Sequence, residues 1–231
     1  MRQQQITYKS NVSLVSAHFE SDYLVTIAES HTANHLLQTV NSTEIELRRV
    51  QGEKSEVPDF IQVSLRSRVK RVRVVKTSDR RIYLLIIHQL ENYVELREVV
   101  PHSGRVDSYI QFILAHQDHS THQLLDLEDV HILDWPGQGV WACFNFAQRE
   151  VKMILFEELL LQTHLPVDNL YFDASRCSKL YNQPLYTTPD EGRAFTTETR
   201  LVSIDIYRQK GTDKLVFTRE SGNQEFISHM I

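Results

Sequence analysis

The clearest strand pattern in this chain is Tyr23-Leu24-Val25-Thr26-Ile27-Ala28. Its strand-forming side chains, Tyr23, Val25 and Ile27, occupy every second position, and smaller or polar residues lie between them. This period of two is typical of a strand whose two faces meet different surroundings. One face of the strand is therefore expected to lie in a hydrophobic core.

Three further stretches extend this pattern along the chain. Residues 140–146 and 202–207 repeat the alternation of apolar and polar side chains. Residues 82–87 are apolar throughout, which favours a strand buried on both faces in the middle of its sheet. The chain is therefore expected to be all-β and mainly antiparallel.

The expected strands group into four units of similar layout. The first unit covers 12–50, where 36–40 and 44–50 are expected to be separate strands, and the second covers 69–114. The third begins at 130 and turns at Pro136-Gly137-Gln138-Gly139, and the fourth begins at 201. Repeated units of three or four strands are typical of propeller blades or of an extended sandwich. We expect a single β-propeller-like domain over 1–231, with about four blades, either complete or a partial propeller from a longer protein.

Two segments do not follow the strand pattern. Residues 150–165 are rich in Met, Leu and Glu, and a strand followed by a loop is preferred there over a buried helix. Residues 170–199 contain Asn, Pro and Gly and are expected to form a long loop. Long loops often carry function, and aromatic residues dominate many interfaces. The expected partner-binding aromatic residues of this loop are Tyr171, Tyr181 and Tyr186.

Composition limits the classes of protein to which the chain can belong. A hydrophobic content of 41% over 231 residues is enough to fill a core. The net charge of −5 gives no general attraction to nucleic acid, so no nucleic-acid partner is expected. No apolar run reaches the roughly 18 residues that a membrane-spanning helix needs. Any polyanion or protein must therefore bind to a local surface.

Cysteine content and glycosylation motifs bear on the compartment. Cys143 and Cys177 are too few for a disulfide framework and lack the spacing of a zinc site, and they form either one bridge or none. Asn11-Val12-Ser13 and Asn41-Ser42-Thr43 match the acceptor motif for N-glycosylation. These motifs favour a secreted glycoprotein over a cytoplasmic protein.

Two pairs of segments carry a resemblance to a known repeat. They are 23–28 followed by 35–40, and 139–144 followed by 151–156. Each pair resembles the epilepsy-associated repeat, which is a propeller blade of secreted proteins. The Tyr-Lys-Trp ending of that repeat is replaced here by Leu37-Gln38-Thr39 and by Ile154-Leu155-Phe156. The resemblance implies a secreted, receptor-binding propeller without catalytic activity.

A histidine-rich segment is the first candidate site. Imidazole and carboxylate groups are natural ligands of zinc and copper. The spacing differs from the His-Glu-x-x-His arrangement, so a solvated polar loop is preferred over a metal site. The candidate metal ligands are His116, Asp118, His119 and His122.

A basic segment is the second candidate site. Its cations alternate with valines, as in an exposed strand that is protected from edge-to-edge aggregation. The alternative is a site for a polyanion such as a glycosaminoglycan. The candidate polyanion-binding residues are Arg66, Arg68, Lys70, Arg71, Arg73 and Lys76.

Motifs of nucleophilic, phosphate-binding and dinucleotide-binding enzymes are absent from the sequence. Cys143 lies within a strand pattern and is expected to be an inert core thiol. We therefore expect no catalytic residue and no cofactor. The expected function is a non-catalytic module for protein–protein interaction, adhesion or scaffolding, with a polyanion-binding domain second and a metal-dependent enzyme third.

Overall fold

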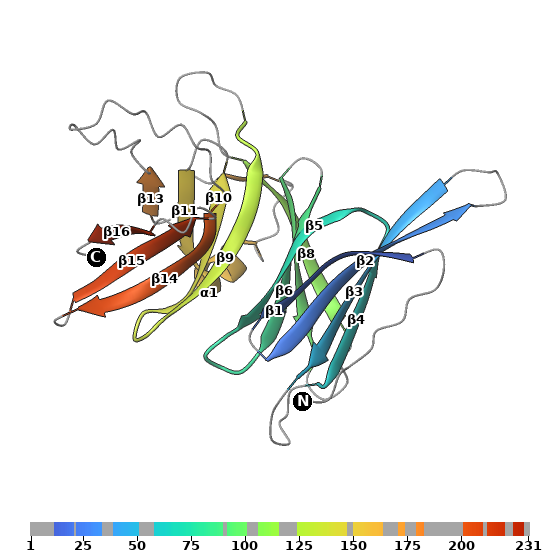
Figure 1. The fold of residues 1–231 in the computed structure, drawn as a ribbon, viewed down its shortest axis with the longest axis horizontal. Coiled ribbons are helices and arrows are strands. Elements are labelled where there is room, and N and C mark those ends of the chain that lie inside the picture. The colour runs from blue at the N-terminus through green and yellow to red at the C-terminus, as the bar shows by residue number, and fades with distance from the viewer. Residues whose placement is uncertain are drawn as a thin grey trace. The chain divides into compact units, whose positions relative to one another are not determined.

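The computed structural model describes strands from residue 12 to residue 228, with gaps between them. The described residues are 12–20, 22–33, 39–50, 58–89, 92–100, 106–115, 124–146, 150–163, 171–173, 179–182, 201–209, 212–219 and 224–228. They form four small sheets and one short helix (Figure 1). Every strand pair whose register is defined is antiparallel, which confirms the prediction of a mainly antiparallel β fold.

Sheet 1 is a four-stranded meander in chain order β1-β2-β3-β4. Tyr23, Val25 and Ile27 are buried, as the alternation predicts. The third strand is continuous over 39–49, so the predicted break between residues 40 and 44 is wrong. The fourth strand was not predicted. The strands are β1 (Val12–Glu20), β2 (Tyr23–Ala33), β3 (Thr39–Arg49) and β4 (Phe60–Leu65).

Sheet 2 has the order β12-β8-β7-β6-β5. Every residue of β6 is buried, and β6 pairs with β5 on one side and β7 on the other, which confirms the interior strand predicted at 82–87. The strands are β5 (Val69–Lys76), β6 (Ile82–His88), β7 (Tyr93–Val99), β8 (Val106–Ala115) and β12 (Tyr171–Asp173).

The chain divides into two compact units, each with a core between two sheets. The first unit is Met1–Ile113 with Asp168–Tyr171, and the second is Leu114–Val167 with Phe172–Ile231. In the first unit, side chains of β2, β3 and β4 pack with those of β5, β6 and β7 in one apolar cluster. At about 25 cal/mol per Å² of buried apolar area, such a cluster is the main stabilising contribution.

The second unit contains sheets 3 and 4. Sheet 3 has the order β13-β11-β10-β9, and sheet 4 has the order β14-β15-β16. Leu133, Trp135 and Trp141 of sheet 3 share an apolar cluster with Ile204 and Leu215 of sheet 4. The strands are β9 (Leu127–Trp135), β10 (Gly139–Phe146), β11 (Glu150–Leu155), β13 (Lys179–Asn182), β14 (Leu201–Gln209), β15 (Thr212–Arg219) and β16 (Gln224–Ser228).

Residues 150–163 combine the two structures that the sequence allowed. The first part is strand β11, as preferred, but the second is helix α1 (Phe156–Thr163) and not a loop. Phe156 and Leu159 are three positions apart and both fully buried, which fixes one face of the helix. Glu157 and Glu158 lie in its first turn, where negative charge is favourable. This helix corrects the preferred loop after residue 155.

Sheets 1 and 4 are uninterrupted meanders, whereas sheets 2 and 3 are interleaved along the chain, because β12 of sheet 2 lies between β11 and β13 of sheet 3. The described residues therefore form a β-rich fold of antiparallel hairpins. No closed propeller is seen among them, and the propeller itself stays a prediction.

Candidate interaction site

The structure places the predicted aromatic and metal-binding residues as follows. Tyr171 lies in β12 and Tyr181 in β13, so parts of the expected loop are short strands. Tyr186 lies outside the described residues, as do the four candidate metal ligands. Within the described ranges, no group of three His, Cys, Asp or Glu side chains is arranged to hold a metal ion.

Cys143 is fully buried in β10 and is a free thiol. Burial raises the pKa of this thiol far above its ordinary value, so the reactive thiolate does not form near neutral pH. Its prediction as a core residue is confirmed. Cys177 lies outside the described residues.

Acidic side chains of sheet 1 lie beside the predicted basic segment. Arg73 Nη1 is 4.0 Å from Glu20 Oε2, and Lys76 Nζ is 2.6 Å from Asp22 Oδ2. Arg68 precedes β5 and lies 3.8 Å from Glu29 through its Nε atom. The hydrogen bond from Lys76 is the main cause that lowers the pKa of Asp22 below its ordinary value. Three of the six predicted polyanion-binding residues therefore form ion pairs within the protein.

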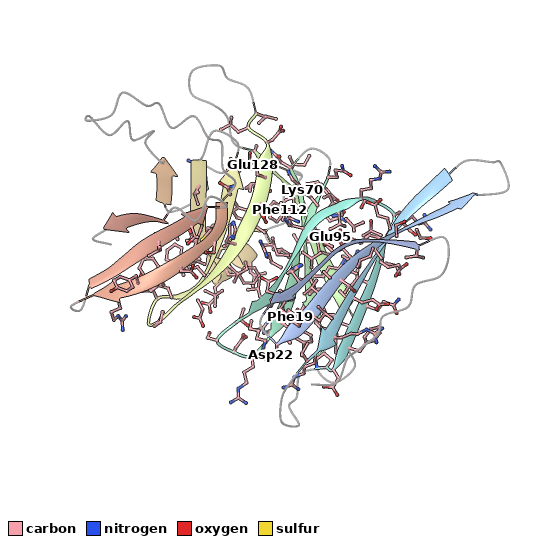
Figure 2. All side chains as sticks on the ribbon, viewed as in Figure 1. Phe19, Asp22, Lys70, Glu95, Phe112 and Glu128 are labelled. Atoms are coloured by element: carbon pink, nitrogen blue, oxygen red, sulfur yellow. The ribbon has the colours of Figure 1, made fainter. Side chains whose placement is uncertain are left out.

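A buried hydrogen-bonded network joins the strands of sheet 2. We call it the His88 network. His88 Nε2 lies 3.0 Å from Glu95 Oε2, and His88 Nδ1 lies 2.8 Å from the Ser67 hydroxyl. Glu95 also accepts hydrogen bonds from Arg97 and, at 3.2 Å, from Gln111. Glu95 is only 1% exposed, and Figure 2 shows it in the first unit.

The electrostatics of the network depend on Glu95. Burial alone raises the pKa of this carboxyl, because desolvation penalises the charged form. The hydrogen bonds with His88, Arg97 and Gln111, together with the charge of Arg97, outweigh burial and hold the pKa below its ordinary value. The carboxylate is therefore ionised in the folded protein at neutral pH.

The His88 network connects the two sheets of the first unit. Thr43, on β3 of sheet 1, donates a 2.7 Å hydrogen bond to the carbonyl oxygen of Ser67. The order hydroxyl, imidazole, carboxylate is also that of a nucleophilic triad. Here, however, Arg97 and Gln111 also donate hydrogen bonds to the Glu95 carboxylate. The Tyr93 ring packs edge-on against His88, with ring centroids 4.8 Å apart. We interpret the network as a structural clamp.

The outer face of sheet 1 is the one that faces away from its apolar core. Successive side chains of a strand point to opposite faces, so the neighbours of the buried residues lie outward. Phe19 pairs with Leu24, Leu24 with Arg48, and Arg48 with Phe60. These four residues form one line across all four strands, which we call the outer row.

The outer row is unusually apolar for an exposed surface. Phe19 is 73% exposed and projects from β1 (Figure 2), and Phe60 is 42% exposed. The Arg48 guanidinium lies 5.2 Å from the centre of the Phe60 ring and 3.0 Å from Glu46 Oε2. Leu14, on the same strand as Phe19, is 52% exposed. Two exposed aromatic side chains on one face, one of them next to a cation, are a suitable binding surface for a protein. The prediction of tyrosines at 171–186 did not include this surface.

A separate groove of about 390 Å³ lies in the second unit, between β9 and β14. Ile132, Leu133 and Ile204 give it apolar walls. Asp134 and Asp205 are both exposed at the groove, and Asp205 accepts a 2.8 Å hydrogen bond from Ser203. These side chains offer no constellation of nucleophile and base.

Comparisons with known proteins do not assign the chain to a class. No family model matches it, no curated protein matches it, and no solved structure matches it. Among the described residues, no helix has the length and apolar character needed to cross a membrane.

Proposed function

We propose that this chain is a non-catalytic protein-interaction module, built from four blade-like sheets, whose contact surface includes the outer row of sheet 1. The observation that carries the proposal is the exposure of Phe19 and Phe60 on one face of one sheet. Aromatic side chains that remain exposed on a rigid sheet are typical of interface hot spots. The four small antiparallel sheets support the propeller-like part of the proposal, as does the resemblance to the epilepsy-associated repeat.

The rigidity of this surface favours protein binding. β2 and β3 lie in the middle of sheet 1, and their inward side chains are fully buried. A partner that covers the outer row orders few additional side chains, because the strands already hold the row in place. Less entropy is then lost on binding.

The alternative partner is a polyanion bound by β5. The ion pairs of Arg68, Arg73 and Lys76 with sheet 1 oppose this alternative, because a polyanion has to compete with carboxylates already in place. We expect the protein to elute from a heparin column at or below about 0.15 M salt. Retention at higher salt that is lost in a Lys70→Gln, Arg71→Gln variant would instead favour the polyanion.

Site-specific photo-cross-linking tests the proposal. A photoreactive phenylalanine analogue is placed at position 19, at position 60, or at control position 207, whose tyrosine is also exposed but lies in sheet 4. We expect one protein to be captured from positions 19 and 60 and not from 207.

The captured protein is then purified, and its Kd is measured on matched variants. Phe19→Ser and Phe60→Ser are expected to weaken binding at least ten-fold, whereas Tyr207→Ser leaves the Kd unchanged. Equal affinity for all three variants would overturn the assignment of the surface.

A further inference from the structure

Strand β1 is an edge strand whose last five residues form a regular edge, unpaired among the described strands. It is hydrogen-bonded to β2 on one side, and no described strand pairs with its other side. Natural edge strands usually carry Lys or Pro, or a bulge, that prevents further pairing. Val12–Glu20 contains no Lys, Arg or Pro. Its one register shift lies between Leu14 and Ser16, so five regular residues from Ser16 to Glu20 remain.

The two faces of β1 have the reverse of the usual polarity. Ala17 and Phe19 on its outer face are exposed, although both are apolar. Ser16, His18 and Glu20 pair with Ile27, Val25 and Tyr23, which places them on the face of the apolar core. We call these three residues the inner polar set.

The inner polar set has unused hydrogen-bonding capacity. Ser16 Oγ, His18 Nε2 and Glu20 Oε2 are all removed from solvent without a hydrogen-bond partner. His18 Nε2 and Arg73 Nη1 lie 3.5 and 4.0 Å from Glu20 Oε2, which is ion-pair distance but leaves this oxygen without a hydrogen bond. Buried polar atoms in native proteins nearly always find partners. Among the described residues, these three atoms lack hydrogen-bond partners that a strand added beside β1 would supply.

We infer that the free edge of β1 binds an extended strand of a partner protein whose apolar residues alternate with basic residues. Side chains directly opposite on neighbouring strands have Cβ atoms about 4.5–5.5 Å apart. The basic side chains of such a strand come beside the inner polar set and donate to Glu20. Its apolar side chains fall on the outer face, where they cover Phe19. The main-chain hydrogen bonds of β1 are completed at the same time.

This inference rests on the proposed function, because both concern sheet 1. Separate experiments can nevertheless contradict either the outer-face surface or the edge of β1 alone. A partner may be cross-linked to Phe19 through the face of the sheet while the edge of β1 binds nothing. The test of the edge therefore uses synthetic peptides and does not depend on the captured protein.

The first experiment measures the binding of fluorescent nine-residue peptides to the full chain by anisotropy. An alternating Val/Lys peptide is compared with an alternating Val/Glu peptide and with a scrambled Val/Lys peptide. We expect saturable binding of the alternating basic peptide, with affinity at least ten-fold higher than that of either other peptide. Equal binding of the scrambled peptide would show a merely electrostatic attraction and overturn the inference.

Matched protein variants locate the site. Glu20→Gln is expected to weaken binding of the basic peptide about ten-fold, because it removes the acceptor charge of the inner polar set. Glu46→Gln is the control, since Glu46 lies on the outer face of β3 in the same sheet and has the same charge. Equal weakening by both variants, or by neither, would contradict a site at the edge of β1.

Backbone methylation distinguishes strand pairing from any other contact. Two versions of the basic peptide are N-methylated at alternate residues, one at odd and one at even positions. Only one edge of a bound strand faces β1, so one version is expected to lose binding and the other to retain it. Two methylated versions with equal affinity would exclude β-strand addition.

A second copy of this chain is the competing occupant of the edge. Sedimentation of the free protein tests it. The inference expects a monomer, or a dimer that Glu20→Gln does not affect. A dimer that Glu20→Gln dissociates would assign the edge to self-association and overturn the inference.

Discussion

Single residues in this protein have roles that depend on their surroundings more than on their chemical type. Glu95 and Glu98 are three positions apart on β7, yet Glu95 is buried in the His88 network and the side chain of Glu98 is 37% exposed. Glu98 lies 3.8 Å from Arg81, at the surface. A glutamate carboxylate is thus a buried hydrogen-bond acceptor at position 95 and a weak ion-pair partner at the surface at position 98.

Glu95→Ala is expected to reduce the free energy of unfolding by about 3–5 kcal/mol, because it leaves buried donors without their acceptor. Glu98→Ala is the control on the same strand, with an expected loss within about 0.5 kcal/mol. Urea denaturation followed by circular dichroism measures both. Similar losses for the two variants would contradict the role of the His88 network as a clamp.

The pH dependence of stability follows from the lowered pKa of Glu95. A carboxyl with a lower pKa in the folded state contributes stability above its unfolded pKa of about 4.3. That contribution is lost as the pH falls through the lower folded pKa. Between pH 7 and pH 3, the free energy of unfolding is expected to fall more in the wild type than in the Glu95→Gln variant. An equal fall in both proteins would mean that Glu95 is not the titrating group.

Secondary-structure elements are fixed partly by local turn chemistry. β9 and β10 are joined by the turn predicted at 136–139, closed by a 2.9 Å hydrogen bond from the Gln138 N–H to the Trp135 carbonyl oxygen. Gly137 has a φ of +79°, a conformation that favours glycine. A Cβ at this position meets no atom within 4 Å, so any cost of a side chain there is purely conformational.

Gly137→Ala is accordingly expected to destabilise the protein by about 1–2 kcal/mol through backbone strain alone. Gln138→Ala, at the next position of the turn, keeps the backbone hydrogen bond and is expected to change stability by less than about 0.5 kcal/mol. Thermal unfolding of both variants gives the comparison. A neutral Gly137→Ala would indicate that the turn relaxes to another conformation.

At the scale of the whole molecule, each of the two compact units contains an apolar cluster of described residues. The chain passes from one unit to the other within β8, between Ile113 and Leu114, with no linker at that point. Both tryptophans of the chain, Trp135 and Trp141, lie in the second unit, 6.2 Å apart between ring centroids. Their fluorescence therefore reports the unfolding of the second unit.

The expectation of a single cooperative domain gives a direct prediction. Leu84→Ala removes a fully buried side chain from the first unit and is expected to cost about 2–5 kcal/mol. In a single domain, the tryptophan fluorescence transition shifts by the same amount as the circular dichroism transition. A fluorescence midpoint that stays at the wild-type value would show that the units unfold independently.

The sequence alone determined most of the strands and the turn at 136–139. Alternation at 23–28, the apolar run at 82–87 and the glycines of the turn act over a few neighbouring residues, so they are readable without knowledge of strand pairing. The helix after residue 155 was the less preferred interpretation of its segment, and strand β4 was not predicted. Phe156 and Leu159 become a buried helical face only when the surrounding core covers them.

The candidate sites depend on contacts between residues that are far apart in the sequence. The acidic partners of the basic segment come from β1, β2 and the turn between them. The register of those strands sets each distance. Glu95 meets His88 and Gln111 from neighbouring strands, and the outer row places Phe19 and Phe60 on one face at opposite edges of sheet 1. A shift of one residue in register moves every side chain to the other face of the sheet. Because register between distant strands is set by packing over the whole sheet, a local pattern of residues does not contain it.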